Sequence, residues 1–179
     1  DSKITTHYAK AIFNLAIETN NIKSIKNDIE LLYKVSNEVD LFKEVLLSPI
    51  IKVSKKQEIF YKLFVNDVDK TTISFLNLIT KNRRESYLKQ MCLDFLTQYR
   101  LLYNIKQVEI TTTKKLTEDF KQNLISIIKN TYKSDVDLNE KVDENIIGGF
   151  ILTIEDKRLD ASISTKLKNI EKELKSSVN

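Results

Sequence analysis

The chain has 179 residues, of which 41% are hydrophobic and 30% are charged, and its formal net charge is +4. It contains two glycines and one proline, too few for the tight reversals of β-sandwiches and β-barrels, so a mainly α-helical fold is favoured. The charge excess is mild and interleaved with acidic residues, which disfavours a nucleic-acid-binding protein. No apolar run approaches the roughly 18 residues of a membrane span, and no secretory signal is recognisable. Because a lone cysteine cannot form an internal disulfide, we expect a soluble intracellular protein.

The first hundred residues predict a succession of amphipathic helices joined by short connections. Apolar residues recur there at three- and four-residue spacing, which is the period of one helix face. We expect Thr5 or Thr6 to cap the first helix, Ser48-Pro49 to end the third, and Ser54 with Gln57 to form a capping box at the start of the fourth. The six predicted helices cover about residues 6–18, 22–38, 41–47, 54–64, 69 or 71 to 81, and 87–103.

Beyond residue 104 the pattern changes to that of a small mixed α/β domain. Short segments rich in β-branched residues alternate in polarity, as half-buried strands do, and two amphipathic helices lie among them. The predicted strands cover residues 107–113, 135–142, 147–154 and 157–160, and the predicted helices cover about 118–132 and 162–174. The fold class is therefore mainly α, with an N-terminal six-helix bundle at residues 1–104 and a small α/β C-terminal domain at residues 105–179.

Both glycines of the chain are adjacent, Gly148 and Gly149, and stand just before an apolar strand. We interpret them as a bulge or a close backbone approach where a Cβ would clash. A phosphate-binding loop is the alternative, but the pair lacks the surrounding motif and precedes a strand, not a helix. Asp143 and Asp160 flank the predicted hairpin and could form a carboxylate pair; capping of turns is the interpretation we favour.

Residues suited to catalysis or metal binding are few and scattered. His7 is the single histidine and is expected at the surface, and no acidic cluster suggests a metal site. Cys92 falls on the apolar stripe of the sixth predicted helix, where a cysteine acts as a small hydrophobic residue. No nucleophile elbow, Walker motif or dinucleotide fingerprint occurs. The sequence therefore predicts a non-enzymatic protein without cofactor or metal.

Two helices carry more apolar surface than a bundle requires. Within residues 8–17 only Lys10 and Asn14 are polar, and the apolar arc covers about 240° when projected at 100° per residue. Residues 73–79 give an arc of about 220°, whereas one-sided packing needs nearer 100°. Either both helices lie centrally in the bundle, or they leave an apolar groove for a helix of a partner protein. The residue pattern leaves both explanations open.

Three motifs carry a resemblance to a known family. Residues 8–16, YAKAIFNLA, are close to the family's RYAKALF-x-LA. Phe75-Leu76 followed by Asn82-Arg83-Arg84 is like its FL-x-L-L-x-x-x-x-R. Residues 142–150 (VDENIIGGF) and 159–162 (LDAS) are like its VDPSLIGG…DGS. In this order and spacing, the chain resembles the delta subunit of bacterial F-type ATP synthases, called the oligomycin-sensitivity-conferring protein in mitochondria.

This resemblance implies a non-catalytic stator subunit of F1Fo ATP synthase, at work in ATP synthesis and hydrogen-ion transport. The N-terminal bundle would bind the N-terminal helix of an α subunit in a groove between its first and fifth helices. The C-terminal domain would hold the C-terminal region of the peripheral-stalk b subunit. The subunit would lie peripherally at the cytoplasmic face of the bacterial plasma membrane, or at an organelle inner membrane in a eukaryote.

Carried onto this sequence, the resemblance also implies the residues of the groove. They are Tyr8, Ala11, Ile12, Leu15, Ser74, Phe75, Leu78 and Ile79. Small Ala11 and Ser74 would let a partner helix approach closely, while Ala9, Phe13 and Leu76 would face the core. Structural roles are expected for Asp143, Gly148, Gly149 and Asp160.

An alternative from another class is a free-standing, basic, helical nucleic-acid-binding protein. It depends on the isoelectric point near 8.9 and on the cluster Lys81-Asn82-Arg83-Arg84. A nucleotide-binding enzyme is a third possibility, but it would need a phosphate site that the sequence does not offer.

Overall fold

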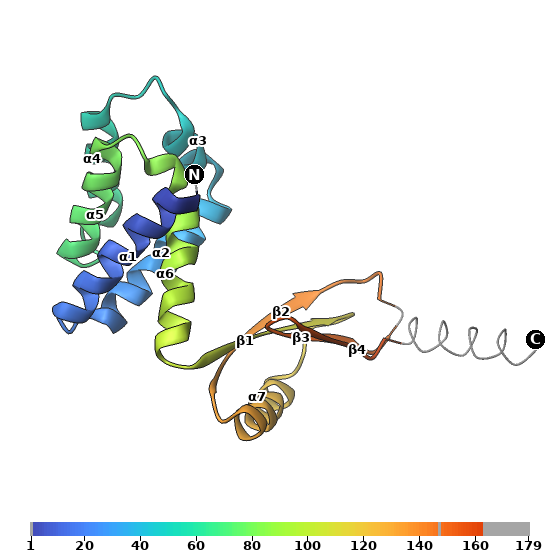
Figure 1. Cartoon of the computed structure of the whole chain (residues 1–179). Helices are drawn as coiled ribbons and strands as arrows, with labels where there is room; N and C mark the ends of the chain where they lie inside the picture. Colours follow the sequence, from blue (N-terminus) through green and yellow to red (C-terminus); the bar gives the residue numbers. More distant parts are fainter. Residues whose placement is uncertain (1, 147, 163–179) are drawn as a thin grey trace, which may run out of the picture. The chain divides into compact units, whose positions relative to one another are not determined.

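The computed structural model describes residues 2–146 and 148–162. Within these residues the protein is mainly helical, with a small four-stranded sheet in its C-terminal part (Figure 1). The chain divides into two compact units at Leu101–Leu102, here called the helical unit and the sheet unit. The closing helix expected at residues 162–174 lies outside the described residues, apart from Ser162. In the part of the chain described, no helix is long and apolar enough to span a bilayer.

The helical unit consists of successive α-helices with short connections. Five of the helices agree with the sequence pattern to within two residues at both ends, and only the start of the first differs by more. The fifth begins after Asp69, whose carboxylate accepts a hydrogen bond from the Thr71 N–H at 2.7 Å. The elements are α1 (Ser2–Glu18), α2 (Ile22–Glu38), α3 (Asp40–Leu47), α4 (Val53–Phe64), α5 (Lys70–Lys81), a 3₁₀ turn at Glu85–Tyr87, and α6 (Leu88–Leu102).

Two predicted helix caps are wrong. The first helix begins at Ser2, so Thr5 and Thr6 lie inside it, and Thr5 is buried against the core. The fourth begins at Val53 and has no side-chain cap, which excludes the capping box expected of Ser54. Gln57 instead donates to the Asn77 carbonyl of α5 at 3.1 Å. In both places a tertiary contact takes the side chain that a local motif would have used.

One continuous hydrophobic core holds the helical unit together. Phe13 packs edge-on to Phe95 with ring centroids 5.4 Å apart, and Phe42 packs in the same way on Phe64 at 5.6 Å. Each fully buried large side chain of this kind contributes about 1.5–3 kcal/mol. Cys92 is fully buried in this core, as predicted, and burial raises the pKa of its thiol.

Buried polar contacts fix the helices in register around this core. The Asp28 carboxylate of α2 accepts from the Asp69 N–H at 2.8 Å and from the Thr72 hydroxyl at 2.7 Å, joining α2 to the start of α5. The Lys56 ammonium of α4 pairs with Glu85 at 2.5 Å and donates to the Leu46 carbonyl at 3.1 Å. Because both members of this ion pair are almost completely buried, each depends on the other for neutralisation.

The sheet unit is a βαβ element extended by a hairpin. Strand β1 pairs in parallel with β2 and antiparallel with β3, and β3 pairs antiparallel with β4. The strand order in the sheet is β2-β1-β3-β4. Helix α7 connects the two parallel strands and packs against β2 (Figure 1). The elements are β1 (Ile105–Thr112), α7 (Glu118–Tyr132), β2 (Asp135–Val142), β3 (Phe150–Ile154) and β4 (Lys157–Asp160).

Sequence patterns located α7, β2 and the hairpin turn correctly, but the third strand begins later than expected. Gly148 and Gly149 have φ values of +67° and +81°, a conformation outside the β region, so pairing starts at Phe150. A Cβ on Gly149 would collide with the Ala161 carbonyl oxygen and lie 2.9 Å from the Ser162 Cα. Glycine therefore allows the end of β4 to pass directly over this turn.

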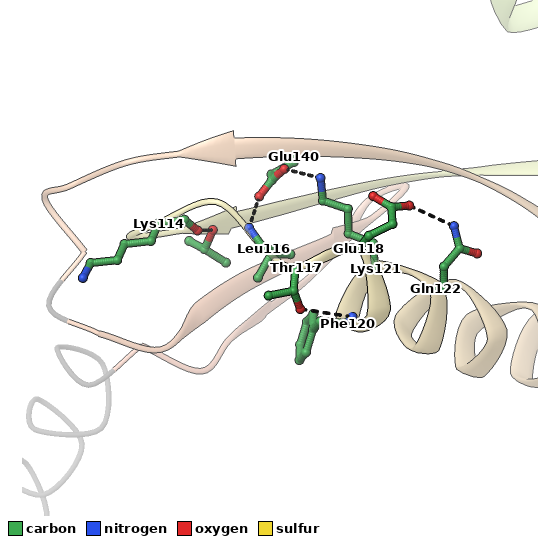
Figure 2. A network of polar contacts seen from close by, with 9 residues as sticks. Lys114, Leu116, Thr117, Glu118, Phe120, Lys121, Gln122 and Glu140 are labelled. Carbon is green, nitrogen blue, oxygen red and sulfur yellow. Dashed lines mark hydrogen bonds and ion pairs between the residues drawn. The ribbon is translucent and has the colours of Figure 1, made fainter.

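A polar network ties the β1–α7 connection to β2, as Figure 2 shows. Glu140 of β2 accepts a hydrogen bond from the Leu116 N–H at 2.5 Å and pairs with Lys121 of α7 at 2.8 Å. Lys121 and the Leu116 N–H both lower the pKa of the Glu140 carboxyl. The hydrogen bond with Glu140 in turn raises the pKa of Lys121. Thr117 caps α7 by accepting from the Phe120 N–H at 3.4 Å.

Candidate partner-binding site

An apolar groove runs along the surface of the helical unit between α1 and α5. Its volume is about 170 Å³. Four residues of each helix form its walls and floor: Tyr8, Ala11, Ile12 and Leu15 from α1, and Thr71, Ser74, Phe75 and Leu78 from α5.

The groove exists because both helices are apolar on their outer side as well as on their core side. In α1, Ala9 and Ala16 are completely buried, yet Leu15 remains 43% exposed. In α5, Leu76 is buried while Leu78 remains 47% exposed. Neither helix is enclosed on all sides, so the surplus apolar arc is accounted for by an outward-facing apolar surface.

Large and small side chains give the groove its shape. Ile12 and Phe75 are buried and form the floor, whereas Leu15 and Leu78 stand at the rim. Ala11 and Ser74, both exposed, keep the walls low. The Ser74 hydroxyl donates to the Lys70 carbonyl at 2.9 Å, so it already has an acceptor and adds little polarity to the wall.

Side-chain hydrogen bonds join the two helices at both ends of the groove. At one end the Asn82 amide donates to the Tyr8 hydroxyl at 2.9 Å. At the other end the Asn21 amide, just beyond α1, donates to the Asp69 carboxylate at 3.1 Å. The groove is therefore held open between two fixed helices, which lowers the ordering cost of binding a ligand.

One of the expected groove residues was assigned incorrectly, and one was missed. Ile79 is completely buried in the core and does not line the groove. Thr71 does line it. The helical period contains the signal for both. Thr71 precedes the groove residues Ser74 and Leu78 by three and seven residues, whereas Ile79 follows the buried core residues Thr72 and Leu76 by seven and three.

A second, larger apolar hollow of about 660 Å³ lies between α2, α3 and α4. Leu41 and Leu63 are its most exposed hydrophobic members, at 74% and 51%. Sequence reasoning missed it because each of these helices contributes only an ordinary apolar stripe, and the hollow arises from their packing.

The remaining candidate residues occupy local structural positions. Asp143 accepts from the N–H of Asn145, which lowers the pKa of its carboxyl, and Asp160 accepts from the N–H of Ser162 at 3.0 Å. Both carboxylates thus bond to an amide two residues further along, as turn-forming aspartates do. His7 is exposed beside Tyr8. Across the described residues, no group of three or more potential ligands could hold a metal ion.

A groove with a buried floor, exposed leucines on its rim and small residues in its walls suits a protein that binds an amphipathic helix. The family model described as ATP synthase delta (OSCP) subunit matches residues 4–174. The chain therefore belongs to the ATP synthase delta/OSCP family, whose members are structural, non-catalytic subunits of the complex. This membership leaves the nucleic-acid-binding alternative without support.

Individual relatives agree with this assignment over most of their length. The ATP synthase subunit delta of Cytophaga hutchinsonii is 35% identical over 96% of this chain and 93% of its own length. That of Christiangramia forsetii is 31% identical, over 97% of this chain and 94% of its own length. A chain of the Toxoplasma gondii mitochondrial ATP synthase hexamer has the same fold, with a TM-score of 0.76 at 20% identity, over 95% of this chain and 96% of that chain.

Proposed function

We propose that this chain is the stator subunit that links the F1 catalytic head of ATP synthase to its peripheral stalk. In that position it keeps the head from turning with the rotor, so that rotor torque is used for ATP synthesis. Family membership over residues 4–174 supports this assignment. The subunit makes and breaks no bond; its contribution is the binding energy that holds two parts of the complex together.

The helical part, residues 1–104 as a six-helix bundle, binds the N-terminal helix of an α subunit in the α1–α5 groove. The observation that carries this proposal is the groove itself, which is lined by every expected residue except Ile79. An amphipathic helix that places apolar side chains between Leu15 and Leu78 would gain about 1.5–3 kcal/mol for each large side chain that it buries.

The second part, residues 105–179, holds the C-terminal region of the stalk b subunit. Its exposed apolar side chains support this assignment, since Phe120 and Ile127 on α7 are 45% and 63% exposed and Leu159 on β4 is 58% exposed. Large apolar side chains that remain exposed are often part of a protein interface. The subunit reaches the cytoplasmic face of the plasma membrane, or an organelle inner membrane, through these partners.

The substitution Ala11→Asp tests the groove. Ala11 is exposed in the free protein, so an aspartate there stays hydrated and the fold is kept. A bound helix would bury the charge without a partner, and affinity should fall by about 3 kcal/mol, roughly a hundredfold. Calorimetric titration with a peptide of the α-subunit N-terminus measures this loss.

Asn14→Asp is the matched control, because Asn14 is also exposed on α1 but does not line the groove. It introduces the same charge one turn away and should leave the affinity nearly unchanged. Equal affinities of a folded Ala11→Asp protein and the wild type would contradict the groove assignment. Co-purification of α and b subunits with the chain tests the linking function as a whole.

A further inference from the structure

The α2–α3–α4 hollow has the shape of a bowl. Helices α2 and α4 form two of its walls, and α3, which joins the C-terminal end of α2 to the N-terminal end of α4, closes one end. Its volume of about 660 Å³ is far larger than the groove's volume of about 170 Å³. It lies within the range of roughly 300–1,000 Å³ that small-molecule pockets occupy. The two surfaces share no lining residue, so each can bind independently of the other.

The lining of the hollow is apolar and partly open to solvent. Phe42 and Phe64 are buried at its base, with ring centroids 5.6 Å apart. Val39, Leu41 and Leu63 remain 43%, 74% and 51% exposed. A ligand with an apolar body would remove these three side chains from water, which is the main driving force for binding in such a pocket.

One charged group belongs to this lining, the carboxylate of Asp67. Asp67 follows the end of α4 by three residues, in a turn where its N–H donates to the Phe64 carbonyl at 3.0 Å. Its side chain is exposed, and it forms no hydrogen bond or ion pair with any residue that the structure describes. A single polar group in an apolar pocket fixes the orientation of a ligand and selects its chemistry.

Two lysines near the hollow are held by other carboxylates. Lys43 of α3 pairs with Asp40 at 2.8 Å, and Lys62 of α4 pairs with Glu58 at 2.7 Å. Lys34 is exposed on α2 but does not line the hollow. The charge that a bound ligand meets inside the hollow is therefore negative.

We propose that the α2–α3–α4 hollow binds a hydrophobic monoamine, a small molecule with an apolar ring body and one protonated amine. The body lies over Phe42 and Phe64, and the ammonium lies against the Asp67 carboxylate. Because Asp67 is exposed, the ammonium keeps part of its hydration, and no charge has to be buried. This binding activity goes beyond the linking function, and neither depends on the other.

Three probes with the same apolar body test the ligand class: naphthylethylamine, naphthylethanol and naphthylacetate. Each is titrated into the full chain while the methyl signals of its leucines and valines are followed by NMR. Signals of Val39, Leu41 and Leu63 should shift, whereas those of Leu15 and Leu78 in the groove should not. We expect the amine to bind about fivefold more tightly than the alcohol, the ratio given by one exposed ion pair of about 1 kcal/mol, and the carboxylate to bind most weakly.

Asp67→Asn tests the selecting charge. Because Asp67 is exposed, the variant should stay folded, and it should bind the amine and the alcohol equally. Glu18→Gln is the matched control, since it removes one exposed carboxylate from α1, outside the hollow. This control should keep the fivefold preference for the amine.

Val39→Trp tests the hollow itself by filling part of it, and it should abolish the shifts of Leu41 and Leu63. Val65→Trp is its matched control, because Val65 is also partly exposed at a helix end but does not line the hollow. Circular dichroism establishes that both variants are folded. If Val39→Trp does not fold, the comparison of Asp67→Asn with Glu18→Gln decides the question.

Several results would overturn the proposal. If no probe shifts the methyl signals of the hollow, the site is wrong. Equal affinities of the amine and the alcohol for the wild-type protein, or a preference that persists in Asp67→Asn, would overturn the ligand class. Shifts of the same signals when only the protein concentration is raised would show that a second copy of the chain occupies the hollow. The linking function is tested separately, by calorimetry with the α-subunit peptide.

Discussion

The helical unit buries twenty hydrophobic side chains in one core, whereas the sheet unit, as far as its residues are described, buries few. Those of the sheet unit are Val108, Ile110, Ile128 and Ile146. Its other strand residues are mostly half-buried, and the contacts that define its shape are backbone pairing, the Glu140 network and the Gly149 turn.

This difference determines what each unit can tolerate. In the helical unit the inner faces of α1 and α5 already fill the core, so their outer faces are free to form a binding groove without loss of stability. In the sheet unit a single polar or backbone contact contributes a larger share of the unit's stability, because fewer apolar side chains are buried there. Four predictions test this comparison, beginning with the largest effect.

In the helical unit, Lys56→Met should be severely destabilising. It leaves the Glu85 carboxylate buried without its cation, which costs about 3–5 kcal/mol. Urea unfolding followed by circular dichroism measures the loss. Lys62→Met is the control, because its ion pair with Glu58 on the same helix is exposed and contributes little. If both variants unfold at the same urea concentration, burial is not what makes Lys56 important.

In the sheet unit, Gly149→Val should cost roughly 2–3 kcal/mol, because valine resists positive φ and its Cβ would collide with the Ala161 backbone. Amide NMR signals of β1 and α6, recorded during thermal unfolding, report the two units separately. Only the sheet-unit signals should disappear at lower temperature. Ser126→Val on the exposed surface of α7 controls for adding a valine; equal melting of the two variants would contradict the close approach.

Thr117→Ala removes the cap of α7 and should destabilise the sheet unit by about 1 kcal/mol. Ser54→Ala should change the helical unit by less than about 0.5 kcal/mol, since Ser54 makes no capping bond. Thermal melts of both variants give the comparison. A larger loss for Ser54→Ala would show that the capping box forms in solution.

The smallest expected effect is on how the stability of the sheet unit varies with pH, to which Glu140 contributes. Because its pKa is lowered in the folded protein, the unfolded state binds the proton more readily. The contribution of Glu140 is complete above its ordinary pKa near 4.5, and it is lost as the pH falls through the lower folded value. Glu140→Gln should flatten this part of the stability profile, whereas the helical unit's profile should not change.

Local chemistry was sufficient to predict several elements from sequence. The bounds of α7 and β2 and the turn between β3 and β4 follow from helical period, strand alternation and turn residues. The same rules left the start of α5 open between Asp69 and Thr71, and the structure shows Asp69 as its cap. The wrong caps at Thr5 and Ser54 show the limit of such rules. There, packing against another helix buried Thr5 and drew Gln57 away to a carbonyl of α5.

Sequence by itself determined that α1 and α5 have apolar surface to spare, because a projection of side chains around one helix needs no knowledge of its neighbours. Only the tertiary structure decided which part of that surface is inside. Packing places Ile79 in the core and Thr71 in the groove, pairs Tyr8 with Asn82, and creates the α2–α3–α4 hollow. These features depend on contacts between residues far apart in the chain, whose distances no local pattern specifies.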